Sequence, residues 1–75
     1  MTIEEFVEHF ADEMSETPAE QITAETNYKE LAEWGSLTSL SIISMIEEEY
    51  DKLITGADVR ARNSVKELWE YVESL

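Results

Sequence analysis

Three stretches of this chain place apolar residues at the spacing of an α-helix, and no stretch alternates apolar and polar residues as a half-buried strand would. These stretches are residues 2–15, residues 36–50 and the segment that follows Ser64. Each has an apolar stripe that must be buried, so the helices are expected to pack against one another around a shared core. The pattern predicts an all-α fold.

The first and third stretches begin with the same helix-start signal. Thr2 is followed three residues later by Glu5, and Ser64 is followed in the same way by Glu67, which is the spacing of a capping box. Both segments are therefore expected to be capped, amphipathic helices. Their apolar stripes consist of Ile3, Phe6, Val7, Phe10 and Met14 in the first and of Val65, Leu68, Trp69 and Val72 in the third.

The middle stretch, residues 36–50, is the most apolar of the three, which places it at the centre of the fold. Gly35 interrupts the chain in front of it, and Ser36 is the residue expected to cap this helix. Three glutamates stand near its end, just before Tyr50. Acidic side chains at a helix C-terminus oppose the helix dipole, so this placement lowers stability. A functional role for the three glutamates is therefore favoured.

The long connection between the first two helices, residues 16–35, needs anchors, because a structureless loop of this length is unusual in a compact domain. A short helical turn is expected at residues 28–32, and residues 56–61 are expected to form a short third helix with Val59 pointing inward. Residues 1–75 then make a single four-helix domain with a short third helix and a long loop between helices one and two. The anchors along that loop are Ile22, Tyr28, Leu31 and Trp34.

The charge balance is strongly acidic, with 18 Asp and Glu against five Lys and Arg and a formal net charge of −13. Such a field repels nucleic-acid phosphates and anionic lipid, and it attracts proteins with basic patches. Acidity also keeps a small protein in solution, so charge alone leaves both explanations open. No apolar run is long enough to cross a bilayer, and no basic and apolar leader begins the chain. We expect a cytoplasmic protein without membrane or nucleic-acid partners.

The residues that catalysis or metal binding would need are missing. His9 is the only histidine, there is no cysteine, and no Ser-His-Asp or Cys-His set can be assembled. His9 itself is expected to be a surface residue of the first helix. The acidic run from Glu47 to Asp51 lacks the spacing of a calcium-binding loop. We therefore expect neither an enzyme nor a metalloprotein.

Ser36 remains as the one residue in an informative setting. It stands at the start of a helix, where amides without intrahelical partners favour a negative charge. The surrounding segment, LAEWGSLTSL at residues 31–40, resembles the attachment site of the acyl carrier proteins, whose Asp-Ser-Leu motif opens their second helix. Ser36 and Leu37 match that motif. The acidic end of the second helix and the last helix, SVKELWEYV at residues 64–72, also resemble this family, so the resemblance covers nearly the whole chain.

The resemblance implies that a phosphopantetheinyl transferase moves a 4′-phosphopantetheine arm from coenzyme A to the hydroxyl of Ser36. The thiol of that arm would carry acyl groups as thioesters in fatty acid, polyketide or related biosynthesis. Acyl-loading and acyl-processing enzymes with basic docking patches would be the partners of a monomeric carrier. Their expected contacts are Leu37, Leu40, Glu47 and Glu48.

The chain departs from the family pattern at two positions near the attachment site. Gly35 stands where the family has an aspartate that assists the transferase, which puts the rate of modification in doubt. Ser41 stands where many members are acidic, which puts one partner contact in doubt. Ser39 is a rival hydroxyl, and it ranks below Ser36 because it lies one turn into the helix.

Other functions stay open beside the acyl carrier. An aminoacyl, peptidyl or D-alanyl carrier would present a serine in the same setting, although the high acidity favours acyl cargo. An unmodified acidic interaction module with a carrier fold is the alternative from a different class, and Gly35 is the residue that supports it best. In the acyl carriers a fatty chain folds back between helices. The residues that would line such a cavity, unless they are ordinary core, are Ile43, Met45, Ile46 and Val59.

Overall fold

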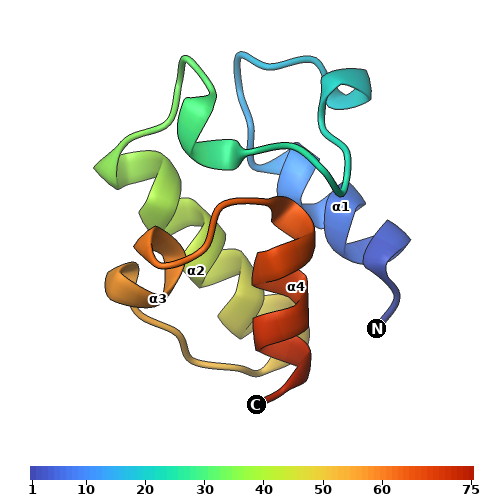
Figure 1. Cartoon of the computed structure of the whole chain (residues 1–75), viewed down its shortest axis with the longest axis vertical. Coiled ribbons are helices and arrows are strands. Elements are labelled where there is room, and N and C mark those ends of the chain that lie inside the picture. The colour runs from blue at the N-terminus through green and yellow to red at the C-terminus, as the bar shows by residue number, and fades with distance from the viewer.

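The computed structural model describes residues 1–75 and contains only helical elements (Figure 1). The one β-type pairing is an isolated bridge between Asn27 and Ser64. The expected four-helix, all-α fold with a short third helix and a long first connection is thus confirmed. The elements in chain order are α1 (Ile3–Asp12), the 3₁₀ turns η1 (Ala19–Gln21) and η2 (Tyr28–Glu30), α2 (Ser36–Tyr50), α3 (Gly56–Arg60) and α4 (Val65–Glu73).

The helices pack as a small bundle in which α1 contacts both α2 and α4, and α3 packs on α2. Figure 1 shows the α1–α2 connection crossing the end of the bundle at which α2 and α4 begin, while both chain termini lie at the opposite end. None of the helices combines the length and the apolar character that crossing a membrane requires. The arrangement leaves the start of α2 at the rim of the bundle, beside the long connection.

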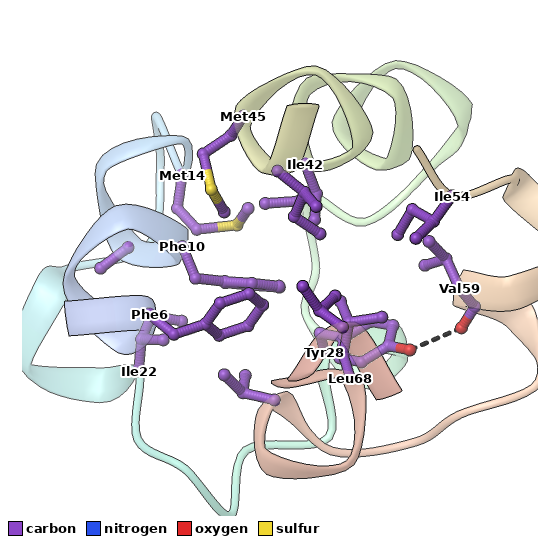
Figure 2. Close-up of a cluster of buried hydrophobic side chains, with 14 residues drawn as sticks. Phe6, Phe10, Met14, Ile22, Tyr28, Ile42, Met45, Ile54, Val59 and Leu68 are labelled. Carbon is purple, nitrogen blue, oxygen red and sulfur yellow. Dashed lines mark hydrogen bonds between the residues drawn. The ribbon is translucent and has the colours of Figure 1, made fainter. Parts of the chain in front are cut away.

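One cluster of 14 buried residues forms the core, and no charged side chain is among them (Figure 2). Aromatic rings from α1 and η2 meet at its centre, where the centroids of Phe10 and Tyr28 are 5.7 Å apart. The stripes predicted for the first and last helices supply five of the other twelve members, and α1 and α4 pack against each other through them. The cluster consists of Phe6, Phe10, Ala11, Met14, Ile22, Tyr28, Ile42, Met45, Ile46, Ile54, Val59, Val65, Leu68 and Val72.

Three of the four helices begin with a capping box, in which a hydroxyl and a carboxylate satisfy backbone amides reciprocally. Two of these boxes were predicted, whereas the third, at the start of α3, was missed because an aspartate takes the place of the usual glutamate. The three pairs are Thr2 with Glu5, Thr55 with Asp58, and Ser64 with Glu67.

The longest helix, α2, begins differently from the other three. Its N-cap is Gly35, in an extended conformation with φ −176°, and no side chain caps it. Ser36 is the first residue inside the helix, so the expectation that Ser36 is the N-cap is wrong. The backbone explains this, because Gly35 has the extended dihedrals of an N-cap and its carbonyl accepts the Ser39 amide at 2.9 Å.

Helix α1 is shorter than predicted and ends at Asp12 rather than near residue 15. The amides of Ser15 and Glu16 donate to the side chain of Glu33 instead of continuing the helix. The last turn closes locally, since the amides of Glu13 and Met14 donate to the carbonyls of Phe10 and Ala11, and the contact with Glu33 holds the chain directly after it. The short elements η2 and α3 also end earlier than expected, at Glu30 and Arg60.

The long connection between α1 and α2 is anchored as predicted, with Ile22 and Tyr28 buried and both Leu31 and Trp34 packed against the core. The Tyr28 hydroxyl lies within hydrogen-bonding distance of two carbonyl oxygens, at 2.5 Å from Val59 and 3.0 Å from Arg62 (Figure 2). Burial raises the pKa of Tyr28 to about 12, so this donor keeps its proton at neutral pH. The connection is thereby tied to the segment that joins α3 to α4.

Candidate functional site

Ser36 is exposed at the start of α2, and no hydrogen bond within the protein involves its hydroxyl. The neighbouring Thr38 differs, because its hydroxyl donates to the carbonyl of Glu33 at 2.8 Å. Ser39, the rival hydroxyl, is half-buried one turn further along. Of these three side chains, Ser36 alone combines exposure with an unengaged hydroxyl, and both are needed for an external enzyme to modify it.

The first turn of α2 has no internal compensation for its positive end. The amides of its first three residues have no intrahelical acceptor, no side chain accepts from them, and the first turn contains no acidic residue. The other helices all carry a carboxylate at this place. A negative group attached to Ser36 would therefore be stabilised by the helix dipole.

The segment in front of Ser36 is held by the carboxylate of Glu33. One carboxylate oxygen accepts the Ser15 amide at 3.0 Å, and the other accepts the Glu16 amide at 3.1 Å and the Thr17 hydroxyl. The hydrogen bond from Thr17 and those from the two amides hold the pKa of Glu33 below its usual value. We call this set of hydrogen bonds the Glu33 clasp, and it fixes the approach to Ser36 against the end of α1.

Sequence reasoning missed the Glu33 clasp, because nothing separates Glu33 from the other acidic residues around it. Trp34 was expected to be a packing residue, and it is one. Its ring stacks on Phe10, with centroids 6.3 Å apart and planes only 5° from parallel, and its centroid is 4.8 Å from that of Tyr28. Glu33 and Trp34 together hold the chain on two sides immediately before the attachment residue.

A groove of about 350 Å³ opens beside Ser36 between α2 and α3. Leu40, Ile43 and Val59 give it an apolar lining, and Arg60 is its only charged side chain. Of the four residues considered for an acyl cavity, Ile43 and Val59 line this groove, whereas Met45 and Ile46 are buried in the core. The complete lining consists of Trp34, Gly35, Ser36, Ser39, Leu40, Ile43, Gly56, Val59 and Arg60.

The predicted docking residues lie on the solvent side of α2. Leu37 is 81% exposed and Leu40 is 57% exposed, both close to the attachment residue. Glu47 and Glu48 are exposed two to three turns further along, and neither forms an ion pair within the chain. The spacing of these four residues follows the helix period, so they form one stripe, which we call the α2 stripe.

His9 lies half-buried at the other end of the bundle, far along α2 from Ser36. Its Nε2 atom is 3.7 Å from a carboxylate oxygen of Glu49, and its ring meets the edge of Tyr50 with centroids 5.6 Å apart. These residues border a second hollow of about 680 Å³. No three side chains of the metal-binding types are arranged to hold an ion. The arrangement packs the end of α2 against α1.

Comparisons with known proteins found no matching family model, no similar curated protein and no similar solved structure. The functional interpretation therefore depends on the chemistry of Ser36 and its surroundings.

Proposed function

We propose that this protein is a carrier whose Ser36 receives a 4′-phosphopantetheine arm and which delivers acyl groups to partner enzymes as thioesters. The observation that supports it best is the exposed, unengaged Ser36 hydroxyl at the start of α2, the one α-helix whose start has no side-chain cap. The resemblance to the acyl carrier proteins around residues 31–40 points to the same residue. Fatty acid, polyketide or related biosynthesis would be the setting.

The residues around Ser36 fit this group. When the arm is attached, the hydroxyl oxygen of Ser36 forms a bond to the phosphorus that carries the arm in coenzyme A. The bond from that phosphorus to the nucleotide half of coenzyme A breaks, and a base of the transferase takes the proton of the Ser36 hydroxyl. The new phosphodiester would lie beside the amides of the first turn of α2, which have no other acceptor. The group supplies a terminal thiol that forms thioesters, and the chain itself has no cysteine that would compete for cargo.

Partner enzymes would dock on the α2 stripe. Leu37 and Leu40 offer apolar contact beside the attachment residue, while Glu47 and Glu48 offer carboxylates for Arg and Lys of the partner. Contacts of this kind give fast, weak and salt-sensitive association, which suits a carrier that visits several enzymes in turn. The cargo is acyl in this proposal, and an aminoacyl, peptidyl or D-alanyl group is the alternative on the same arm.

The proposal is tested by intact-protein mass after incubation with coenzyme A and a broad-specificity phosphopantetheinyl transferase. We expect the wild type to gain one phosphopantetheine, Ser36→Ala to gain none, and the matched control Ser39→Ala to gain one. A gain in Ser36→Ala or a loss in Ser39→Ala would contradict the assignment of the residue.

Gly35 supports the second candidate, an unmodified acidic interaction module, and it also offers the variant that separates the two. No atom lies within 4 Å of the position that a Cβ would take at Gly35, and its backbone is extended, so Gly35→Asp restores the aspartate of the carrier motif without a clash. We expect Gly35→Asp to be modified faster than the wild type. If neither protein gains mass with several transferases, the interaction module replaces the carrier as the proposed function.

A further inference from the structure

The groove beside Ser36 combines an apolar lining with a single cation, Arg60. The guanidinium is folded back along α3, because its Nη1 atom is 3.2 Å from the place that a Cβ at Gly56 would occupy. Gly56 itself lines the groove, so the charge lies over the groove wall rather than extending away from the molecule.

Arg60 has no carboxylate partner, although the chain contains 18 Asp and Glu. The N-terminal ammonium pairs with Glu73, and Glu49 lies beside His9, so neither of these contacts involves Arg60. Asp58, the acidic residue of α3, accepts the amide of Thr55 in the capping box. A guanidinium is therefore left available at the groove, in a molecule where carboxylates are plentiful.

A second cation strengthens the positive potential at this place. The ammonium of Lys29 donates to the carbonyl oxygen of Arg60 at 2.9 Å, which brings it against the same turn of α3. Neither Lys29 nor Arg60 has a carboxylate of the chain within ion-pair distance. The groove that Ser36 and Arg60 both line thus has a cation in its lining and a second cation next to it, whereas the protein as a whole has a net charge of −13.

We propose that Arg60 binds an anionic group in this groove, so that the carrier holds either the phosphodiester of its arm or a carboxylate at the end of its cargo. The inference deepens the carrier function and rests on it. A guanidinium binds phosphate and carboxylate through two parallel hydrogen bonds, and Leu40, Ile43 and Val59 contact the adjoining carbon chain. The cargo class that fits a groove of about 350 Å³ with one cation is a short acyl group that ends in a carboxylate.

The test records the side-chain Nε–Hε signal of Arg60 by NMR in four samples of ¹⁵N-labelled protein: unmodified, with the arm, with a succinyl thioester and with a butyryl thioester. A shift on attachment of the arm identifies the phosphodiester as the bound group. A shift that occurs with succinyl and is absent with butyryl identifies the cargo carboxylate. An Arg60 signal that stays unchanged in all four samples overturns the proposal.

Two variants provide the matched comparison. Arg60→Gln removes the cation from the groove, and Lys66→Gln removes an exposed cation of α4 that does not line it. Gly56→Ala keeps Arg60 but places a methyl group 3.2 Å from its guanidinium, which must move. We expect free 4′-phosphopantetheine or succinate to bind the unmodified protein roughly tenfold more weakly after Arg60→Gln, with Gly56→Ala in between and Lys66→Gln unchanged.

The measurement of anion binding to the unmodified protein also makes the anion site and the carrier function separately testable. Intact mass reports whether Ser36 takes the arm, and it does not depend on Arg60. If no transferase modifies the wild type, the carrier function fails. The groove still counts as an anion site if free 4′-phosphopantetheine or succinate binds in an Arg60-dependent way. If the arm attaches while Arg60→Gln binds both anions as well as the wild type does, the anion site fails and the carrier function stands.

Discussion

At the scale of single residues, the carboxylate of Glu33 joins the end of α1 to the approach to Ser36. It accepts hydrogen bonds from the amides of Ser15 and Glu16 and from the hydroxyl of Thr17. Because these donors favour the charged form, the pKa of Glu33 is lower in the folded protein than in the unfolded chain. The clasp therefore adds stability above the unfolded value of about 4.5, and this contribution is lost as the pH falls through the lower folded value.

Glu33→Gln should lower the midpoint of thermal unfolding at pH 7 by a few degrees, because an amide cannot accept from all of these donors. The difference from wild type should shrink as the pH falls below about 4.5 and through the lower folded pKa of Glu33, where the wild-type carboxylate also loses its charge. Glu30→Gln is the control, since no hydrogen bond involves that exposed side chain. Melting curves followed by circular dichroism across this pH range decide it, and equal midpoints for the two variants at pH 7 would refute the clasp.

Ser36 could be predicted from the sequence, but the Glu33 clasp could not. The physical reason is that the pattern around Ser36 is local, whereas the clasp joins residues that are far apart in the chain. A serine after a glycine and before an apolar run is a local pattern that can be interpreted without a fold. The role of Glu33 as a hydrogen-bond acceptor depends on residues just after α1, more than 15 positions away in the chain, and no local pattern encodes that contact. The same holds for Arg60, whose place in the groove arises only when α3 packs on α2.

At the scale of helices, the starts of all four α-helices were predicted to within one residue, because the signals for a helix start act within one turn. The bounds of α2, Ser36–Tyr50, match the prediction, but its N-cap is Gly35, so the cap itself was placed one residue too late, at Ser36. The end of α1 was assigned too late, because the amides of Ser15 and Glu16, which a longer helix would use, donate to Glu33 instead. Apolar periodicity gave the number and order of the helices correctly.

The uncapped start of α2 leads to a prediction about stability. Gly35→Asp supplies a side chain that accepts from the first-turn amides and a charge that suits the dipole, so it should raise the free energy of unfolding by about 0.5–1 kcal/mol. Gly35→Ala is the matched control, because it shares the lower entropy of the unfolded chain but has no acceptor. Urea denaturation of both variants measures the difference. If Gly35→Asp is no more stable than Gly35→Ala, the backbone amides in the first turn of α2 already have adequate acceptors.

At the scale of the whole molecule, the dominant feature is a net charge of −13, against which the one ion pair between permanently charged groups joins the N-terminal ammonium to Glu73. The repulsion among the carboxylates weakens the compact state, and salt screens it. Raising sodium chloride from about 20 mM to about 300 mM should therefore raise the midpoint of thermal unfolding by several degrees. Sucrose at matched osmolality is the control for effects unrelated to charge. A midpoint that stays constant or falls with salt would show that self-repulsion is not a significant term in the stability of this bundle.

The two ends of the chain lie together at the end of the bundle opposite the start of α2 (Figure 1). Their proximity is seen in the contact between the N-terminal ammonium and Glu73, at 3.6 Å. A bead, a sensor chip or a fused polypeptide joined at either end would therefore leave Ser36 facing outward. Both orientations of tethering should present the serine equally well, which makes this small bundle suitable for immobilised display of whatever group its serine carries.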